Sequence, residues 1–272
     1  MIAAAEQVTV RFGVRTALDA VTVTVPAGAV VAVVGGDGAG KTTLLRVLVR
    51  EVIPDAGTVT APGKHEIGYL PAGPASWAAL TVRENLDFVG GVYGLTGAGL
   101  RRRREALIER CGLTAAADRP AAALSGGMRR KLGVAMATIH RPPLLILDEP
   151  STGVDPVSRI DLWRMVSEAA AAGAAVLLST TYLDEAERAA HLVVLDAGRI
   201  LVQGSYDEVR AGFPGTVTGG ADPVRPQWAW RRGRERREYW PDTAVGTAAP
   251  RIDPDLEDIV IALSLARQQA RA

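Results

Sequence analysis

The sequence has little cysteine, little net charge and no long apolar run. Cys111 is the one cysteine in 272 residues, so an internal disulfide is excluded and a reducing, cytosolic environment is favoured. Lysine and arginine together number 31, against 30 aspartate and glutamate residues. This near-balance gives no global argument for binding nucleic acid or an acidic membrane surface.

The sequence also has no pattern typical of a signal peptide or of a membrane span. Residues 1–6 contain neither a basic nor an apolar signal region. The most apolar stretch, residues 169–178, is mostly alanine and is interrupted by Gly173, and it falls well short of the ~20 residues that span a bilayer. We therefore expect a soluble chain that acts at a membrane only through a partner.

The residues that are present suit one large α/β domain with a small appendage. Hydrophobic residues make up 48% of the chain, which is enough for a core. Residues 8–10 and 21–25 alternate apolar and polar side chains, which predicts half-exposed antiparallel strands. Residues 29–34, 144–147 and 174–178 predict buried strands, with helical patterns between them. We expect a mainly parallel core sheet with an antiparallel β edge made by the N-terminal strands.

The stretch at about residues 76–140 has a helical pattern without a convincing strand, which predicts an inserted helical subdomain. Thr81 and Glu84 have the spacing of a capping box at a helix start. The basic run at residues 101–104 is interpreted as a solvated helix face rather than a binding patch. Residues 192–202 predict a hairpin around a central turn.

The composition changes in the last quarter of the chain. Residues 211–226 are rich in Gly, Pro and Thr, as in a linker, and residues 228–240 predict a second hairpin. The six arginines within residues 225–237 alternate with glutamate and are interpreted as a solvated face, so no nucleic-acid partner is expected. We therefore divide the chain into a domain of residues 1–210 and a small C-terminal extension, residues 211–272, with a hairpin and a terminal helix.

The strongest chemical signal is a glycine-rich segment between a predicted buried strand and a predicted helix. Such a turn directs successive backbone N–H groups and the helix dipole at one point, which attracts phosphate. Lys41 would reach the β- and γ-phosphates, and the Thr42 hydroxyl would bind Mg²⁺. A chance glycine-rich turn is the alternative, and the flanking strand and helix argue against it. The residues of this phosphate loop are Gly35, Gly36, Asp37, Gly38, Ala39, Gly40, Lys41, Thr42 and Thr43.

Three further segments follow the phosphate loop along the chain, and the last is Thr152-Gly153-Val154-Asp155-Pro156, which alone would be interpreted as a turn. Ser125, Gly126 and Gly127 precede a predicted helix, whose N-terminus suits an anion. Asp148 and Glu149 end a predicted buried strand, where Asp148 can hold the water shell of Mg²⁺ and Glu149 can orient or deprotonate an attacking water. Each segment alone has an ordinary interpretation as a helix cap, an acidic strand end or a turn. The combination in this order and spacing is far more specific than any one segment.

The order and spacing of these motifs resemble the nucleotide-binding subunit of ATP-binding cassette (ABC) proteins over about residues 6–210. The resemblance implies the P-loop NTPase fold of ABC proteins and the cofactors ATP and Mg²⁺. It also implies a head-to-tail homodimer, or a heterodimer with a second ABC ATPase, in which residues 125–127 serve the partner's ATP. Phe12 would stack on adenine, as aromatic side chains stack on bases elsewhere. Asp155 and Thr181 would belong to the nucleotide-binding set.

A narrower resemblance is to the ATPases of drug and antibiotic exporters. Residues 182–188 match these ATPases, and residues 254–261 are similar to the closing segment of their C-terminal extension. The resemblance implies an integral-membrane permease as partner, whose cytoplasmic helices would dock on the helical region after Pro71. The expected location is the cytoplasmic face of the membrane, reached through that permease.

Two positions depart from the family pattern. Ala72 stands where the family has a glutamine that contacts Mg²⁺ or water, and Thr181 stands where it has a histidine that contacts the γ-phosphate. Loss of one preorganised donor typically costs ~10²–10³ in rate. Because Glu149 is retained, we expect a site that binds ATP and hydrolyses it slowly, paired with an active site on a different subunit. The alternative is an ordinary homodimer in which both residues are tolerated, and the sequence does not decide between the two.

The sequence is compatible with three functions. The leading hypothesis is the ATPase subunit of a membrane exporter. The second is a regulatory module that uses ATP as a clamp and rarely hydrolyses it. The third, a soluble ABC ATPase that acts on ribosomes or DNA, is disfavoured because the chain has one cassette and no long heptad run.

Overall fold

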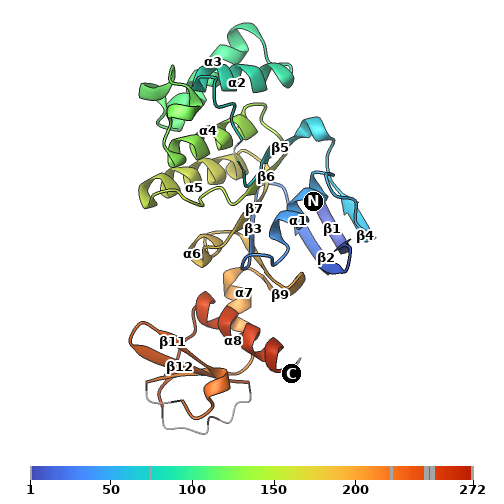
Figure 1. Ribbon diagram of the computed structural model, residues 1–272, viewed down its shortest axis with the longest axis vertical. Coiled ribbons are helices and arrows are strands. Elements are labelled where there is room, and N and C mark those ends of the chain that lie inside the picture. The colour runs from blue at the N-terminus through green and yellow to red at the C-terminus, as the bar shows by residue number, and fades with distance from the viewer. Residues whose placement is uncertain (1, 74, 221–222, 242–244, 246–248, 271–272) are drawn as a thin grey trace.

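The computed structural model describes residues 2–73, 75–220, 223–241, 245 and 249–270. A six-stranded sheet lies in the middle of the molecule (Figure 1). Its strand order is β5 (Ile67–Leu70), β6 (Leu144–Asp148), β7 (Ala175–Thr180), β3 (Val30–Val34), β8 (His191–Asp196) and β9 (Arg199–Gly204). Neighbouring strands are parallel except for the β8–β9 hairpin. The predicted parallel core sheet and the hairpin at residues 192–202 are confirmed.

The core sheet is buried on both faces. On one face, Val31 and Val33 of β3 pack in a cluster with Leu44 of α1 (Lys41–Leu48). On the other face, Ala32 and Val34 pack in a second cluster with residues of α4 (Gly126–Thr138) and α5 (Pro156–Ala171). Strands buried on both faces need nearly continuous apolar sequence, which explains why these segments read as uninterrupted apolar runs.

The N-terminal strands form a sheet of their own. β1 (Ala3–Phe12) pairs antiparallel with β2 (Arg15–Val25) and with β4 (Ala56–Thr60). The prediction that these strands form the edge of the core sheet is therefore wrong, and β9 is its antiparallel edge strand. The physical reason is that β1 and β2 have one apolar face, including Val8 and Leu18, that packs on α1 opposite the core sheet instead of extending it.

The helical subdomain lies at the end of the molecule drawn uppermost in Figure 1. Its elements are α2 (Val82–Val92), α3 (Gly97–Arg110), the short 3₁₀ turns η2 (Thr114–Ala116) and η3 (Ala121–Ala123), and α4. Thr81 caps α2 by accepting the N–H of Glu84, as the capping box predicts. Within the described residues, no helix is long and apolar enough to cross a membrane.

The basic run at the start of α3 is only partly solvated. Arg101 and Arg102 are exposed. Arg103 instead donates to the carbonyl oxygens at the C-terminal end of α4, and Arg104 pairs with Asp87 of α2. The solvated-face interpretation is therefore wrong for half of the run, because these two side chains cross to neighbouring helices.

The C-terminal extension is built on a four-stranded sheet and one helix. Its elements are β10 (Thr216–Gly220), η4 (Pro226–Trp228), β11 (Ala229–Arg232), β12 (Glu235–Trp240), β13 (Arg251–Ile252) and α8 (Leu256–Gln269), and the strand order is β11-β12-β10-β13. The predicted second hairpin is confirmed as β11 and β12. The predicted linker is partly wrong, because β10 is a central strand whose Val217 is buried against Tyr239. Residues 221–222 of that segment lie outside the described residues.

Helix α8 attaches the extension to the rest of the chain. Leu256 and Ile259 are fully buried in the main core cluster, and Arg267 donates to the carbonyl oxygen of Ile200 at 2.7 Å. On its other side, the buried Asp258 pairs with Arg232 and Arg237 of the hairpin. These two arginines are therefore partly buried and paired within the extension, which corrects the solvated-face interpretation for them. The boundary at residue 210, within α7 (Tyr206–Ala211), stays a prediction.

Candidate functional site

The phosphate loop connects β3 to α1 through a backbone that only glycine tolerates at its end. Gly40 caps α1 with a φ of 109°, and a Cβ there would lie 2.6 Å from the carbonyl oxygen of Ala17. No side chain caps the first turn of α1. The backbone N–H groups of that turn and the positive end of the helix dipole are therefore available to an anion.

Lys41, the first residue of α1, is only 5% exposed. Its Nζ donates to the carbonyl oxygens of Gly35 at 2.8 Å and Gly36 at 3.2 Å, and it lies 3.3 Å from Oε1 of Glu149. A buried ammonium needs such partners, because burial without them would disfavour its charge. The loop and the end of β6 are thus brought together as the sequence predicts.

The two acidic residues at the end of β6 have different environments. Asp148 is fully buried, and its Oδ1 accepts the Ser179 hydroxyl at 2.5 Å. Glu149 has a φ of 49°, which is rare for a residue other than glycine, and its Oε2 accepts the Thr152 hydroxyl at 3.0 Å. Ser179 Oγ also accepts the backbone N–H of Glu149 at 2.9 Å. Ser179 therefore positions both acidic residues.

A cavity of about 320 Å³ joins the segments predicted to bind nucleotide. Its lining residues are Phe12, Arg15, Ala17, Asp37, Gly38, Ala39, Gly40, Lys41, Thr42, Thr43 and Glu149. Phe12 ends β1 with its side chain 55% exposed, so one ring face is open to stacking. Three of the predicted residues do not line the cavity. Gly35 and Gly36 accept hydrogen bonds from Lys41, which does line it, and Asp148 is the neighbour of Glu149 in the chain.

Arg15 and Ser179 belong to this site but were not predicted from the sequence. Arg15 begins β2 directly after the turn that follows Phe12, and its Nη2 lies 3.4 Å from the carbonyl oxygen of Gly38. A basic residue three positions after the candidate adenine platform was the available signal. Ser179 lies near the end of β7, next to β6 in the parallel sheet, and only the register Asp148–Ser179 reveals its role.

The residues predicted to serve a partner's nucleotide, Ser125, Gly126 and Gly127, lie close to Asp155, which was predicted to bind nucleotide without being assigned to a partner. Ser125 caps α4 by accepting the N–H of Met128 at 3.2 Å. Asp155 caps α5 by accepting the N–H of Ser158 at 3.0 Å, and these backbone hydrogen bonds lower the pKa of its carboxyl. A Cβ on Gly127 would lie 3.4 Å from the Asp155 carboxylate. Ser125, Gly126, Gly127 and Asp155 are absent from the lining of the chain's own cavity.

Ala72 and Thr181, the two positions predicted to depart from the family pattern, offer few free polar atoms. Ala72 has only a methyl group, and its carbonyl oxygen accepts from Arg130 at 3.3 Å. Thr181 is exposed and does not line the cavity. Its neighbour Thr180 is buried and donates to Glu185 at 2.7 Å, so its hydroxyl is already used.

Arg130 of α4 links the two sides of the site. Its guanidinium donates to the carbonyl oxygens of Pro71 at 3.1 Å, Ala72 and Gly73 on one side. On the other side it donates to the carbonyl oxygens of residues 148–150, including Glu149 at 2.7 Å. Burial lowers the pKa of Arg130, and nearby Asp148 and Glu149 oppose that effect. One side chain thus holds the loop of Ala72 against the end of β6 that carries Glu149.

Known proteins are similar to this chain in sequence, and solved structures are similar to it in fold. A family model described as "ABC transporter" matches residues 18–152. The Nod factor export ATP-binding protein I of Ralstonia nicotianae is 40% identical over 210 residues, which cover 73% of this chain and 65% of that protein. The daunorubicin resistance ATP-binding protein DrrA3 of Streptomyces coeruleorubidus is 39% identical over 212 residues, covering 74% of this chain and 67% of that protein.

The chain spans less than two thirds of the length of some of its relatives. The probable multidrug ABC transporter ATP-binding protein YbhF of Escherichia coli is 41% identical over 191 residues, which are 66% of this chain and 33% of that protein. A solved ATP-binding subunit of an ABC transporter has a TM-score of 0.72 at 30% identity, covering 78% of this chain and 93% of that one. By sequence, fold and the assembled nucleotide site, the chain belongs to the ABC transporter ATP-binding family and is an ABC ATPase domain.

Proposed function

We propose that the chain is the ATP-binding subunit of an ABC-type membrane exporter and that its own ATP site hydrolyses slowly. The observation that carries this proposal is the cavity that joins Phe12, the phosphate loop and Glu149. In it, Phe12 stacks on adenine, the loop amides and Lys41 hold the phosphates, and Glu149 orients the attacking water.

The residues at the end of β6 fit Mg²⁺. Oδ2 of Asp148 is buried and has no hydrogen-bond partner among the described residues, which is costly for a carboxylate oxygen. The water shell of a metal ion would satisfy it. Thr42, whose hydroxyl would bind the ion, lines the cavity together with Glu149, the neighbour of Asp148. When bound, Mg²⁺ would neutralise charge on the β- and γ-phosphates.

The contact between Lys41 and Glu149 suggests that nucleotide binding precedes activation of Glu149. The ammonium lies 3.3 Å from the Glu149 carboxylate and also binds two loop carbonyl oxygens. A phosphate in the loop competes for the same ammonium, because its charge is larger and it is also bound by the loop amides. Glu149 is then free to accept a proton from water. Nucleotide binding therefore prepares the general base.

Slow hydrolysis follows from what Ala72 and Thr181 lack. Each position removes one polar contact near the γ-phosphate, and loss of one such donor costs ~10²–10³ in rate. The complete set at Ser125, Gly126 and Gly127 lies outside the chain's own cavity, which supports its use on a partner's nucleotide. The same two residues favour a second candidate, a regulatory ATP clamp, which differs in having almost no repeated turnover even with a partner.

The test is ATPase activity of the purified chain, alone and mixed with candidate partner cassettes. The double variant Ala72→Gln with Thr181→His should raise the turnover of the chain alone by ~10²-fold or more. Adding Glu149→Gln to the double variant is the matched control, because it should remove the gain if the gain arises at this site. Turnover of the unmodified chain alone at ordinary enzyme rates, above ~1 s⁻¹, would contradict the weak-site proposal.

An exposed aromatic surface that begins five residues after Ala72 supports docking of a permease. Trp77 and Phe88 are 46% and 49% exposed, and their rings contact each other with centroids 4.5 Å apart. Val92, one turn further along α2, is 60% exposed. Exposed apolar residues that gather in this way mark interaction sites. The names of the relatives, which include Nod factor export and daunorubicin resistance proteins, support export as the process.

The permease proposal is tested by co-purification with candidate membrane subunits. Phe88→Asp should abolish co-purification, because it places a charge in the centre of the apolar surface. Ile53→Asp is the matched control, since Ile53 is equally apolar, 89% exposed and far along the chain from α2. A chain that fractionates only with ribosomes or DNA would overturn the exporter proposal.

A further inference from the structure

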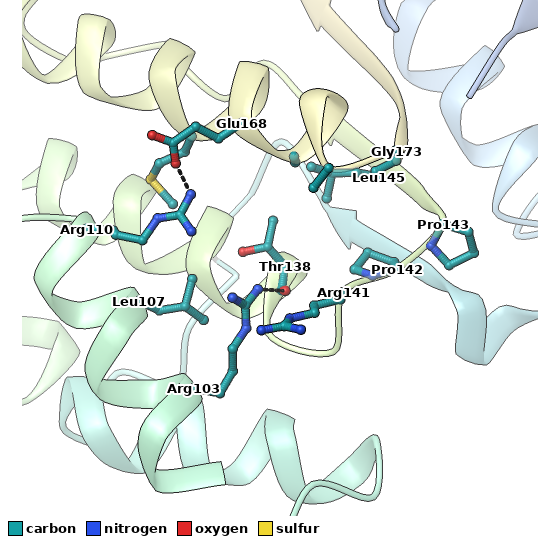
Figure 2. Close-up of a pocket in the computed structure, with 14 residues that line it drawn as sticks. Arg103, Leu107, Arg110, Thr138, Arg141, Pro142, Pro143, Leu145, Glu168 and Gly173 are labelled. Atoms are coloured by element: carbon teal, nitrogen blue, oxygen red, sulfur yellow. Dashed lines mark hydrogen bonds and ion pairs between the residues drawn. The ribbon is translucent and has the colours of Figure 1, made fainter. Parts of the chain in front are cut away.

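A second cavity, of about 540 Å³, lies at the opposite end of β6 from Asp148 and Glu149 (Figure 2). It is bounded by α3, by the ends of α4 and α5, and by the segment that leads into β6. No residue that lines the nucleotide cavity lines this one. Its volume is within the range of small-molecule sites, roughly 300–1,000 Å³. The two cavities are therefore separate candidate sites.

The inner wall of this cavity is apolar. Leu107, Leu145 and Met165 are buried and line it from three different elements, α3, β6 and α5. Pro142 and Ala169 extend the same surface. A wall of this kind favours the hydrocarbon part of a ligand, at about 25 cal/mol per Å² of apolar area removed from water. It offers nothing to a small inorganic anion.

The rim of the cavity is cationic. Arg103, Arg110 and Arg141 line it together with one acidic residue, Glu168, so three positive charges and one negative charge leave a formal net charge of +2. Figure 2 shows Arg103 and Arg141 side by side at the rim, with Arg110 turned to Glu168. Repulsion from Arg141 and Arg110 adds to burial in lowering the pKa of Arg103. Glu168 offsets the charge of Arg110, so the cavity keeps a net positive field from Arg103 and Arg141.

The three arginines differ in the hydrogen bonds and ion pairs that their guanidinium groups already make. Arg103 donates to the carbonyl oxygens of Ile139 at 3.1 Å and Thr138 at 2.8 Å, and so helps to terminate α4. Arg110 is paired with Glu168. Among the described residues, nothing forms an ion pair or side-chain hydrogen bond with Arg141. Its backbone is held at a φ of 54° by a hydrogen bond from its N–H to Thr138, and it precedes Pro142. Arg141 is thus an exposed cation on an ordered backbone, without a counter-ion among the described residues.

We propose that this cavity binds an amphipathic organic anion, a carboxylate on a hydrocarbon body, with its charged group on Arg141 and its body on Leu107, Leu145 and Met165. The carboxylate accepts a charge-assisted, two-pronged hydrogen bond from the Arg141 guanidinium, the geometry in which arginine binds carboxylates best. Remaining donors of Arg103 lie beside it. The site is independent of the proposed export function, because it shares no residue with the nucleotide cavity.

The ligand is a free small molecule in this proposal, not a membrane surface. The apolar wall is recessed inside a cavity, whereas a lipid surface needs apolar and basic groups on an outward-facing element. A bound molecule would bridge α3 of the helical subdomain and α5 of the core. It would also contact the C-terminal end of α4, whose N-terminal end carries Ser125.

The test is calorimetric titration of the full chain with decanoate, below its micelle concentration. A non-hydrolysable ATP analogue with Mg²⁺ is present at saturation so that the phosphate loop cannot bind the carboxylate. We expect one equivalent to bind, and Arg141→Gln to weaken binding by about tenfold or more. Ala172→Phe, which fills the cavity mouth at an exposed lining position, should abolish binding. Arg102→Gln is the matched control, because Arg102 is exposed on α3 and outside the lining.

Three companion measurements decide between the possible outcomes. Decyltrimethylammonium has a similar chain with the opposite charge and should not bind, and inorganic phosphate should not bind because it has no apolar part. Equal decanoate affinity in the unmodified chain, Arg141→Gln and Ala172→Phe would overturn the proposal. So would equal binding of the cationic amphiphile, or binding to phosphatidylglycerol vesicles without binding of free decanoate. Retained affinity for the ATP analogue shows that each variant is folded.

Discussion

Replacing Arg130 tests how the loop that carries Ala72 is held against the catalytic strand end. Its guanidinium contacts six backbone carbonyl oxygens, three in residues 71–73 and three in residues 148–150. Arg130→Met removes these contacts while keeping a side chain of similar length. The carbonyl oxygens then lose their donor, and residues 71–73 lose their connection to Glu149.

The size of the effect follows from those contacts. A hydrogen bond from a charged donor contributes about 1.5–3 kcal/mol net, but the contacts share the five N–H donors of one group and are not additive. Burial, which lowers the pKa of Arg130, offsets part of the gain. We therefore expect Arg130→Met to lower the free energy of unfolding by about 3–5 kcal/mol, as for breaking a buried charged network. Arg130→Lys keeps the charge but reaches only one of the two segments at a time. It should therefore recover about half of the free energy of unfolding lost in Arg130→Met.

The assay is urea unfolding of the chain and its variants, together with ATP affinity and turnover. Arg129→Met is the matched control for stability, because Arg129 is the exposed neighbour of Arg130 on α4. Arg130→Met should reduce turnover more than ATP affinity, since the phosphate loop does not contact Arg130 whereas the Glu149 backbone does. A stability change within about 0.5 kcal/mol, typical of surface substitutions, would refute the reasoning.

Three further predictions concern buried or reactive side chains. Glu149→Gln should lower turnover by ~10²-fold or more while nucleotide affinity, measured with a fluorescent ATP analogue, stays within a few-fold, and a larger loss of affinity would assign Glu149 to binding. Burial beneath Tyr93, whose ring centroid is 3.6 Å away, lowers the pKa of His140 from 6.5 to about 4, so below pH 6.5 the unfolded chain binds a proton that the folded chain does not. The free energy of unfolding should therefore fall by about 2 kcal/mol between pH 7 and pH 5, and His140→Phe should flatten this slope; an unchanged slope would exclude His140 as its source. Burial raises the pKa of Cys111 to about 12, so its thiol should resist a disulfide reagent at pH 8 in the native chain and react after denaturation, and fast native labelling would contradict its burial.

Local sequence patterns predicted those parts of the fold that depend on local interactions. The apolar run at residues 29–34 and the glycines after it determine a buried strand and a turn by sterics alone, and β3 and α1 follow. The capping residues Thr81 and Ser125 start their helices as the spacing predicts. Local patterns were insufficient where the pairing of a strand depended on residues far away in the sequence. Alternation in β1 and β2 shows one buried face but not which sheet the strands join.

The candidate site divides in the same way. The sequence by itself was enough to predict the phosphate loop, Asp148, Glu149 and the departure at Ala72, because each belongs to a short motif with its chemistry inside it. Only the tertiary structure decided which side chains support them from elsewhere. Ser179 and Arg130 act through contacts that span 30 and 19 positions to Glu149. The cavity that gathers Arg103 and Arg141 likewise exists only where packed helices bring distant residues together, since side-chain packing and desolvation have no local sequence pattern.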